Sequence, residues 1–378
     1  MWCRHNSTAP QTAPASNLPA HIPPSGCVNL TPLRGLLAVH GIQSAKFLQG
    51  LITKRFPSET EPTGMFTAFL SPQVYPSPQP KQTQSLTFIQ GRALFDVFIY
   101  TATPAFAGIQ QIHPSPAYII EVDRSQMQML KWHIQRYKVR SKFKAFEIPE
   151  SRLQVFSIWP ALPLHNPNEK HLGIVDPRSP HLGTRLLSPE PPSLEMFPLD
   201  VYHIRRTLNG VPEGQDEIIE SVALPAESNL DVMSGIDFTK GCYIGQELTS
   251  RTYHTGIIRK RLLPLSLFPA TGEIPEPDSL AYDSSLSLPL PPSGTTLTAE
   301  GEKRSPGKFL RGWGNIGWGL VRLDNVGKVL KCNWEDRSIL AKPFLPEWAD
   351  REKDSATVKP LPQEVVQDTA KYGHRDEI

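Results

Sequence analysis

The segment with the clearest chemical content holds a single cysteine between two glycines. Residues 240–247 read Lys-Gly-Cys-Tyr-Ile-Gly-Gln-Glu, so Cys242 follows Lys240 by two residues and precedes Arg251 by nine. Nearby cations lower the pKa of a thiol and make it more thiolate-like, and glycines permit a tight turn or the close approach of a ligand to the backbone. A functional thiol is therefore one interpretation of the pattern. The competing interpretation is a buried structural cysteine in a glycine-bounded turn, since free cysteines are among the most buried residues.

The residues that follow the thiol each have two interpretations. A helix that begins near Gly245 would point backbone N–H groups and the positive end of its dipole toward the thiol. There Glu247 is either a carboxylate that interacts with the helix dipole or a catalytic base, and Arg251 either binds an anion or lies on a solvated face. Tyr243 either stacks on a planar ligand or packs in the core. A cysteine nucleophile with His254 as its base is a weaker alternative, because sequence spacing does not show that the two side chains meet.

A carboxylate lies inside an apolar strand pattern. Residues 92–100 read Arg-Ala-Leu-Phe-Asp-Val-Phe-Ile-Tyr, and such a run predicts a strand that is buried on at least one face. A buried carboxylate is paired or has a raised pKa. Asp96 is therefore either a polar contact or proton acceptor for a bound ligand, or a carboxylate whose hydrogen bonds come from the backbone or an arginine.

The elements that must position these residues are both helical and extended. Apolar residues recur at helical spacing in 41–53 and in 125–137, which predicts a helix in each segment. The run 117–122 predicts a second strand that is buried on at least one face. Beyond Thr255 the apolar runs are broken by glycines and carry no helical period, which predicts a small all-β module, plausibly a barrel. The irregular alternation of helix and strand favours an α+β fold.

Composition limits the classes of protein to consider. The chain has 378 residues, which suggests two to three domains, and a net charge of +2, which argues against a nucleic-acid partner bound through a strongly basic surface. Its four cysteines include no Cys-x-x-Cys pair, so a zinc ribbon is excluded and a reducing compartment is favoured. The sequence has no run of 18 apolar residues, so we expect no membrane span.

Proline marks the segments that surround the predicted core. The 39 prolines gather mainly in 1–32, 72–80, 160–198 and 264–292, whereas 199–263 contains only two. Clustered proline is typical of extended or irregular chain. We therefore expect a loop insertion at 71–87. The first residues are rich in Ser, Thr and Ala with no Asp or Glu before Glu59, which partly matches a mitochondrial presequence although arginine is scarce.

Several sequence blocks together resemble one known family. Residues 240–247, followed by Arg-Thr-Tyr-His-Thr-Gly-Ile-Ile-Arg-Lys-Arg, closely resemble the signature of the YgfZ-type proteins, relatives of the folate-binding glycine-cleavage T-protein, an aminomethyltransferase. Within that group the chain is most similar to the mitochondrial iron–sulfur cluster assembly factors of fungi. Further matching blocks lie at 41–53, 91–100, 176–187, 202–214 and 223–231. The resemblance spans roughly 28–345.

The resemblance implies a fold and a division of the chain. It implies an α+β, aminomethyltransferase-like folate-binding fold followed by a small C-terminal β-barrel. The expected parts are a disordered leader or presequence at 1–27, an α+β region at 28–262 with a break between two subdomains near 150–200, a barrel at 263–346 with a Pro/Ser-rich insertion at 269–308, and a charged tail at 347–378.

The resemblance also implies a function. It is that of an assembly factor in the mitochondrial matrix that helps to mature [4Fe–4S] client enzymes together with A-type iron–sulfur scaffold proteins. A soft thiolate suits transient iron or cluster ligation, with partner thiols completing the ligand set. The implied site residues are Cys242 as the functional thiol and, for cofactor binding, Asp96, Lys240, Gly241, Tyr243, Gly245, Gln246, Glu247 and Arg251. Tetrahydrofolate is the candidate cofactor, and no permanently bound metal is expected.

Three departures from the family patterns bear on the alternative function, a folate-dependent one-carbon (aminomethyl) transferase. The family's first helix usually ends in Thr-Asn-Asp, whereas this chain has Thr-Lys-Arg at 53–55. The T-protein carries paired aspartates where only Asp96 remains, and a pterin-contacting Glu where this chain has Leu208. These losses argue against the transferase function. They remain compatible with a folate-shaped cavity that has altered polar contacts. A non-enzymatic assembly factor is the favoured interpretation.

Overall fold

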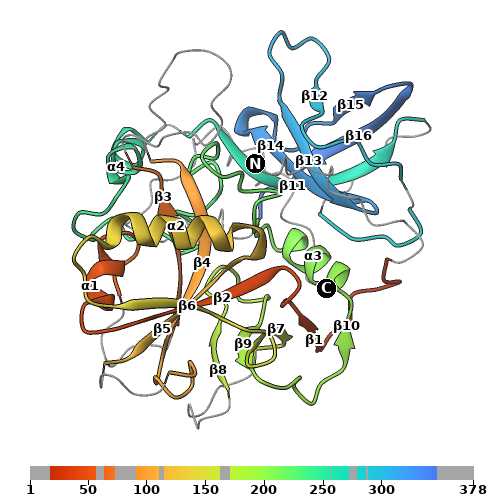
Figure 1. Cartoon of the computed structure of the whole chain (residues 1–378). Coiled ribbons are helices and arrows are strands. Elements are labelled where there is room, and N and C mark those ends of the chain that lie inside the picture. Colours follow the sequence, from red (N-terminus) through yellow and green to blue (C-terminus); the bar gives the residue numbers. More distant parts are fainter. Residues whose placement is uncertain are drawn as a thin grey trace, which may run out of the picture. The chain divides into compact units, whose positions relative to one another are not determined.

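The computed structural model divides into two compact units (Figure 1). The barrel unit comprises 1–22, 200–212 and 258–378, and the two-sheet unit comprises 23–199 and 213–257. Within them the structure describes residues 18–56, 64–72, 91–109, 115–161, 171–256, 258–271, 279–286 and 288–346. The predicted tail at 347–378, most of the predicted loop 71–87 and most of the predicted leader lie outside the described residues.

The two-sheet unit contains two five-stranded sheets. The first sheet has the strand order β10-β1-β7-β9-β8, and the second has the order β3-β4-β5-β2-β6. The first sheet consists of β1 (Gly26–Asn29), β7 (Gln154–Trp159), β8 (Leu172–Val175), β9 (Thr184–Ser188) and β10 (Met196–Phe197). The second consists of β2 (Arg34–His40), β3 (Gly64–Leu70), β4 (Ala93–Ala102), β5 (Ala117–Asp123) and β6 (Lys144–Ile148). All pairings are antiparallel except that of β1 with β10.

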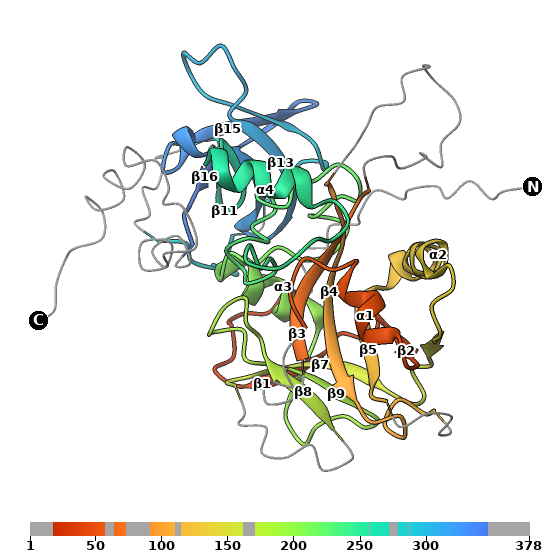
Figure 2. The same ribbon diagram turned by 90° about the vertical axis from the view of Figure 1, so that its left-hand side faces the viewer.

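Helices cover one face of the second sheet, as Figures 1 and 2 show. They are α1 (Ser44–Gln49) and α2 (Met127–Lys138), the latter preceded by the 3-10 turn η2 (Arg124–Gln126). Leu48 of α1 and Leu130 and Ile134 of α2 join one apolar core with sheet residues such as Val97 and Ile120. The helical periodicity thus predicted both helices correctly. However, α1 is shorter than 41–53, because the chain turns at Gly50 and Ile52 already bridges to Phe69.

The two faces of β4 differ in chemistry, which matters for Asp96. Nearly every residue of the strand is buried, so both of its faces are covered. Because side chains alternate along a strand, Val97 and Ile99 point into the apolar core, while Asp96, Phe98 and Tyr100 lie on the opposite face. That opposite face meets charged side chains carried by the first sheet and its loops, including Arg185.

The barrel unit contains a closed six-stranded barrel with the order β11-β14-β13-β12-β15-β16. Its elements are β11 (Lys260–Pro269), β12 (Thr296–Thr298), β13 (Gly307–Trp313), β14 (Ile316–Arg322), η3 (Leu323–Asn325), β15 (Leu330–Trp334) and β16 (Arg337–Pro343). The helix α3 (Leu199–Leu208) belongs to the same unit from Asp200 onward. The predicted α+β fold with a terminal barrel is therefore confirmed.

Two of the predicted boundaries differ from the structure. Strand β1 begins at Gly26 and Cys27 is fully buried, so the last residues of the predicted leader 1–27 belong to the first sheet. The predicted insertion 269–308 contributes β12 to the barrel. Both strands are short and flanked by Pro, Ser or Gly, so their sequences resemble loops.

Within the described part of the chain, no helix combines the length and apolar character needed to cross a bilayer.

A buried histidine in the core makes stability depend on pH. His133 of α2 is fully buried, packs against the rings of Phe69, Phe95 and Tyr137, and has no hydrogen-bond partner on either ring nitrogen among the described residues. Burial lowers its pKa to about 4, with a further contribution from the charge of Arg136. The folded state therefore binds this proton less readily than the unfolded state, whose histidine titrates near 6.5.

We expect the free energy of unfolding to fall as the pH drops from 6.5 through 4, by about 3 kcal/mol at most from this group. Above pH 6.5 His133 is neutral in both the folded and the unfolded state, so this loss of stability is absent. His133→Phe should remove most of this dependence, as measured by urea unfolding at several pH values. His21→Gln, at an exposed histidine, is the control and should leave the slope unchanged. An identical pH slope in His133→Phe and the wild type would contradict the assignment.

Candidate functional site

Cys242 lies in the loop that leads into α4 (Gln246–Thr255) of the two-sheet unit. Its side chain is exposed, whereas Cys27 and Cys332, the other cysteines among the described residues, are buried. The alternative of a buried structural cysteine is therefore wrong. The described ranges contain no group of three or more His, Cys, Asp or Glu side chains that could hold a metal ion.

The Cys242 loop, residues 236–245, is attached by its backbone to the end of α1 and the residues that follow it. The Asp237 N–H donates to the Thr53 carbonyl, with 3.0 Å between nitrogen and oxygen. On the other side of the thiol, the Ile244 N–H donates to the Gly50 carbonyl at 3.1 Å. The loop is thus fixed on both sides of Cys242.

Lys240 points into the protein rather than to solvent. It is 4% exposed, and its ammonium donates to the carbonyl of Gln49 at 2.5 Å and to that of Ile52. The ammonium also lies 4.8 Å from the centre of the Tyr243 ring. Burial lowers the pKa of Lys240 to about 8, although the carboxylate of Asp237 opposes this shift. The two residues that flank Gly241 and Cys242 are therefore buried, while this dipeptide itself is exposed.

The glycines of the motif have different surroundings. Gly245 has a φ of 83°, and a Cβ there would lie 2.6 Å from the Leu70 Cβ and 2.8 Å from the Ser71 carbonyl oxygen. Both the backbone conformation and the packing therefore require glycine at this position. At Gly241, by contrast, a Cβ would meet no atom of the described residues within 4 Å. In the described part of the chain, nothing therefore crowds the Cβ position next to Cys242.

Helix α4 begins directly after Gly245, as the sequence predicted. Glu247 lies exposed in its first turn, where a carboxylate interacts favourably with the helix dipole. Arg251 is exposed on the same helix, Gln246 is half-buried, and Tyr243 is buried with its pKa raised to about 12 by that burial. His254 lies about 12 Å along the helix from its first residue, given a rise of about 1.5 Å per residue, and its neighbour Tyr253 stacks on Phe238 of the Cys242 loop, with 4.0 Å between the ring centres.

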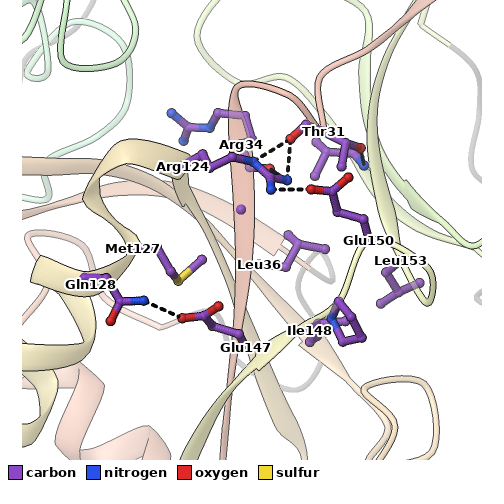
Figure 3. Close-up of a pocket in the computed structure, with 13 residues that line it drawn as sticks. Thr31, Arg34, Leu36, Arg124, Met127, Gln128, Glu147, Ile148, Glu150 and Leu153 are labelled. Carbon is purple, nitrogen blue, oxygen red and sulfur yellow. Dashed lines mark hydrogen bonds and ion pairs between the residues drawn. The ribbon is translucent and has the colours of Figure 1, made fainter.

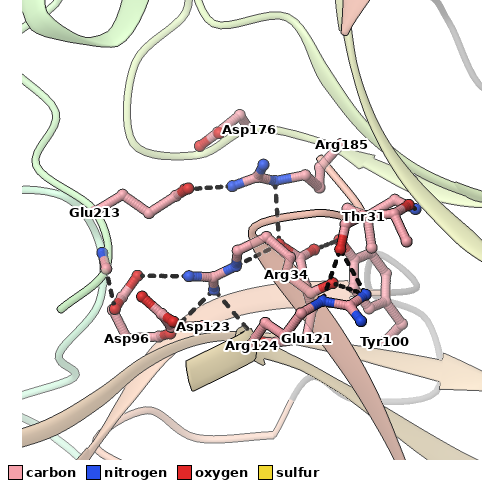
Figure 4. A network of polar contacts seen from close by, with 12 residues as sticks. Thr31, Arg34, Asp96, Tyr100, Glu121, Asp123, Arg124, Asp176, Arg185 and Glu213 are labelled. Atoms are coloured by element: carbon pink, nitrogen blue, oxygen red, sulfur yellow. Dashed lines mark hydrogen bonds and ion pairs between the residues drawn. The ribbon is translucent and has the colours of Figure 1, made fainter. Parts of the chain in front are cut away.

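Asp96 belongs to a buried network of charges, shown in Figure 4. Its Oδ2 lies 3.3 Å from Arg34 Nη1, and its Oδ1 accepts from the Gly214 N–H at 3.2 Å. The same guanidinium donates through Nε to Glu121 Oε1 at 3.0 Å, and the Tyr100 hydroxyl donates to Glu121 Oε2 at 2.8 Å. Arg34 therefore links two carboxylates on neighbouring strands, β4 and β5.

The network continues toward the first sheet. Arg178 is paired with Asp176 at 2.7 Å and with Glu213 at 2.7 Å, and Arg185 is also paired with Glu213. Both guanidinium groups lie over the ring of Phe98, at 4.9 and 4.6 Å from its centre. These arginines and carboxylates come from segments far apart in sequence, and all of them are buried.

Comparison with known proteins places these features in a family. The model of the CAF17 C-terminal β-barrel domain matches residues 259–351. The mitochondrial iron–sulfur cluster assembly factor IBA57 homologue of Neosartorya fischeri is 36% identical over 379 residues, covering 91% of this chain and 80% of that protein. The homologue of Aspergillus clavatus is 38% identical over 366 residues, covering 86% of this chain and 77% of that protein.

The chain belongs to the IBA57 family. Among solved structures, the glycine cleavage system aminomethyltransferase T from Bartonella henselae matches this IBA57-family chain with a TM-score of 0.59 and 11% sequence identity. That match covers 88% of each chain. At this identity the likeness concerns the fold, and it confirms the aminomethyltransferase-like architecture.

Tetrahydrofolate is the cofactor implied by the sequence resemblance, and Asp96 is one of the residues expected to contact it. Burial raises the pKa of Asp96 to about 6, opposed by Arg34 and reinforced by Glu213. Both oxygens of the carboxylate have partners within the chain, and the residue is 1% exposed. Asp96 therefore does not fit as a contact for a bound folate in this IBA57-family chain. Leu208, at the end of α3, offers no polar side-chain atom.

A cavity of about 370 Å³ lies in the two-sheet unit between β2, the start of α2 and the segment that follows β6, and Arg34 of the buried network is one of its lining residues (Figure 3). Its polar lining is internally paired. Arg124 pairs with Glu150 and donates to the Thr31 carbonyl, and Gln128 donates to Glu147. No residue predicted from the Cys242 segment lines it.

Sequence reasoning offered the backbone or an arginine as the partner of Asp96, and both are present, but it did not identify Arg34 and Gly214, and it missed the partners of Lys240. Arg34, Glu121 and Arg185 lie in apolar strand sequences, where a lone charged residue was the available signal. A buried charge needs an opposite charge, so these residues could have been predicted to pair, although not with which partner. The acceptors of Lys240 are backbone carbonyls. Every residue has one, so the residue types at these positions give no signal for the contact.

Proposed function

We propose that this protein is a mitochondrial assembly factor for [4Fe–4S] proteins. It acts in the matrix with A-type iron–sulfur scaffold proteins, and its clients are enzymes such as aconitase-like dehydratases and radical-SAM proteins. Membership of the IBA57 family supports the assembly role. The observation on which the chemistry of the proposal rests is the exposed thiol of Cys242 on a loop that is fixed on both sides.

In this proposal Cys242 is a transient ligand of iron or of an iron–sulfur cluster. The cluster is passed on to a client protein and is not a permanently bound cofactor of this chain. A thiolate is the protein ligand that iron–sulfur clusters prefer. Clusters of this kind take four protein ligands, so one thiol of this chain must act together with thiols of a partner. The open space beside Gly241 supports such an approach, because no described atom lies where a partner backbone would come close.

The direct test is anaerobic mixing of the whole protein with an A-type scaffold protein that carries a [2Fe–2S] cluster. We expect the two proteins to co-elute with the iron and the cluster's circular dichroism spectrum to change relative to the scaffold alone. The proposal fails if the cluster spectrum and the elution of the iron are the same with and without this protein. Mitochondria that lack the protein should, in addition, lose the activity of [4Fe–4S] dehydratases.

The alternative function is a folate-dependent aminomethyl transferase with tetrahydrofolate as its cofactor. The fold supports it, because the matching solved structure is an aminomethyltransferase. The contacts of Asp96 oppose it, because Arg34 and the Gly214 N–H already occupy the carboxylate. Formation of a methylene-folate product from tetrahydrofolate and an aminomethylated carrier protein would establish this alternative. Folate binding by itself would not, since an assembly factor with this fold can retain a folate cavity.

A further inference from the structure

The position of the Lys240 ammonium is unusual for a residue beside an exposed thiol. The last four carbonyls of an α-helix lack intrahelical partners, and a cation near them is favourable. Gln49 is the last residue of α1, and its carbonyl receives the Lys240 ammonium, as does that of Ile52. The ammonium thus provides a donor for two carbonyl groups, and the one on Ile52 belongs to a fully buried residue.

The location of Lys240 in the loop couples these contacts to the thiol. Only Gly241 separates Lys240 from Cys242, and Tyr243 on the other side is buried beneath the same ammonium. The chain therefore turns inward at Lys240, outward for two residues, and inward again at Tyr243. Fixing both inward residues limits the directions in which the Cys242 side chain can leave the loop.

We propose that Lys240 is the positioning residue of Cys242. By binding the carbonyls of Gln49 and Ile52, it holds the Cys242 loop on the end of α1 and presents the thiol to the partner in one orientation. The functional part of this inference rests on the proposed function, whereas the structural part does not. A partner that must share a cluster gains affinity when the ligand is already in place, because ordering a loop on binding costs free energy.

A different role for Lys240 makes a different prediction. If only its charge mattered, removal of the charge would leave the loop in place and its amides protected. If Lys240 positions the loop, removal frees the loop amides, and restoring a cation with several N–H donors rescues both the loop and the cluster. Loop exchange and rescue therefore separate the two roles.

The experiment compares hydrogen–deuterium exchange and cluster sharing in Lys240→Met, Lys240→Arg and the wild type, with the whole protein. In Lys240→Met we expect exchange at the Asp237 and Ile244 amides to rise about tenfold or more, as loss of a charged hydrogen bond implies. The amount of cluster that the variant shares with the scaffold protein should fall by a similar factor. Lys240→Arg should restore most of both, because arginine keeps the charge and the donors.

The control is Lys54→Met, which removes an ammonium–carbonyl contact that is solvent-exposed, to Ser234 at 3.0 Å. Exposed contacts of this kind contribute little, so loop exchange and cluster sharing should stay close to those of the wild type. Should Lys240→Met unfold, which exchange across β4 and β5 would reveal, Lys240→Gln replaces it. With one neutral amide, this variant should show loop exchange between that of the wild type and the loss expected for Met.

The outcomes separate this inference from the proposed function. If the wild type shares no cluster, the proposed function fails, and loop exchange alone still decides whether Lys240 holds the loop. If the wild type shares a cluster and Lys240→Met shares it equally, with unchanged exchange at Asp237 and Ile244, the positioning role is overturned. Equal exchange in Lys240→Gln and the wild type would overturn it as well.

Discussion

Replacing Cys242 with Ser is expected to abolish the maturation of [4Fe–4S] enzymes while leaving the fold intact. The hydroxyl of serine does not ionise near neutral pH and is a poor ligand for iron in sulfur-rich sites, whereas a thiolate is a good one. Because Cys242 is exposed and makes no part of the apolar core, the change should alter the free energy of unfolding by less than about 0.5 kcal/mol.

The measurement is the activity of an aconitase-like dehydratase in mitochondria that contain only the variant. Cys332→Ala is the matched control, because it removes a thiol that is buried in the barrel and whose pKa burial raises to about 11. That variant should lose some stability through a small cavity and keep its activity. Dehydratase activity at the wild-type level in Cys242→Ser would eliminate the role that we give to this thiol.

The Cys242 segment illustrates what sequence predicts well. Local features such as the glycine at the start of α4 depend on only a few neighbouring residues. Residue type and spacing were therefore enough to predict that a helix begins near Gly245. The direction of Lys240 could not be predicted, because its acceptors, Gln49 and Ile52, precede it by 191 and 188 residues. The sequence shows that Lys240 is close to Cys242 along the chain, whereas only the tertiary structure shows that its ammonium points toward the end of α1.

Asp96 illustrates the same limit in the core. An acidic residue in an apolar strand predicted burial and the need for a partner, and left a ligand contact and an internal pair as alternatives. Arg34 precedes it by 62 residues and Gly214 follows it by 118, so only the fold brings these groups together. Strand β12 was missed for a local reason, since three residues among Pro, Ser and Gly give too little alternation to recognise.

The buried network gives the second large prediction, for stability. Arg34→Met is expected to lower the free energy of unfolding by about 3–5 kcal/mol at pH 7, because it removes the cation that is paired with Asp96 and leaves Glu121 with the more distant Arg185, whose Nε lies 3.6 Å from Glu121 Oε1. Asp96 and Glu121 are 1% and 0% exposed, so neither carboxylate is solvated in the folded protein. Chemical denaturation of the whole protein measures the loss. Lys131→Met, which breaks the half-exposed pair with Glu147, is the control and should cost less than about 1 kcal/mol.

The pH dependence of the loss identifies its cause. Burial already holds the pKa of Asp96 near 6, above its unfolded value of 3.8, so ionised Asp96 costs stability above pH 6 and this cost disappears as the pH falls. Without Arg34 the pKa rises further, and the difference between variant and wild type should therefore shrink between pH 7 and pH 5. Asp96→Asn added to Arg34→Met should recover part of the loss at pH 7, since a neutral amide needs no cation. A loss that is independent of pH and unaffected by Asp96→Asn would mean that Arg34 contributes packing rather than charge.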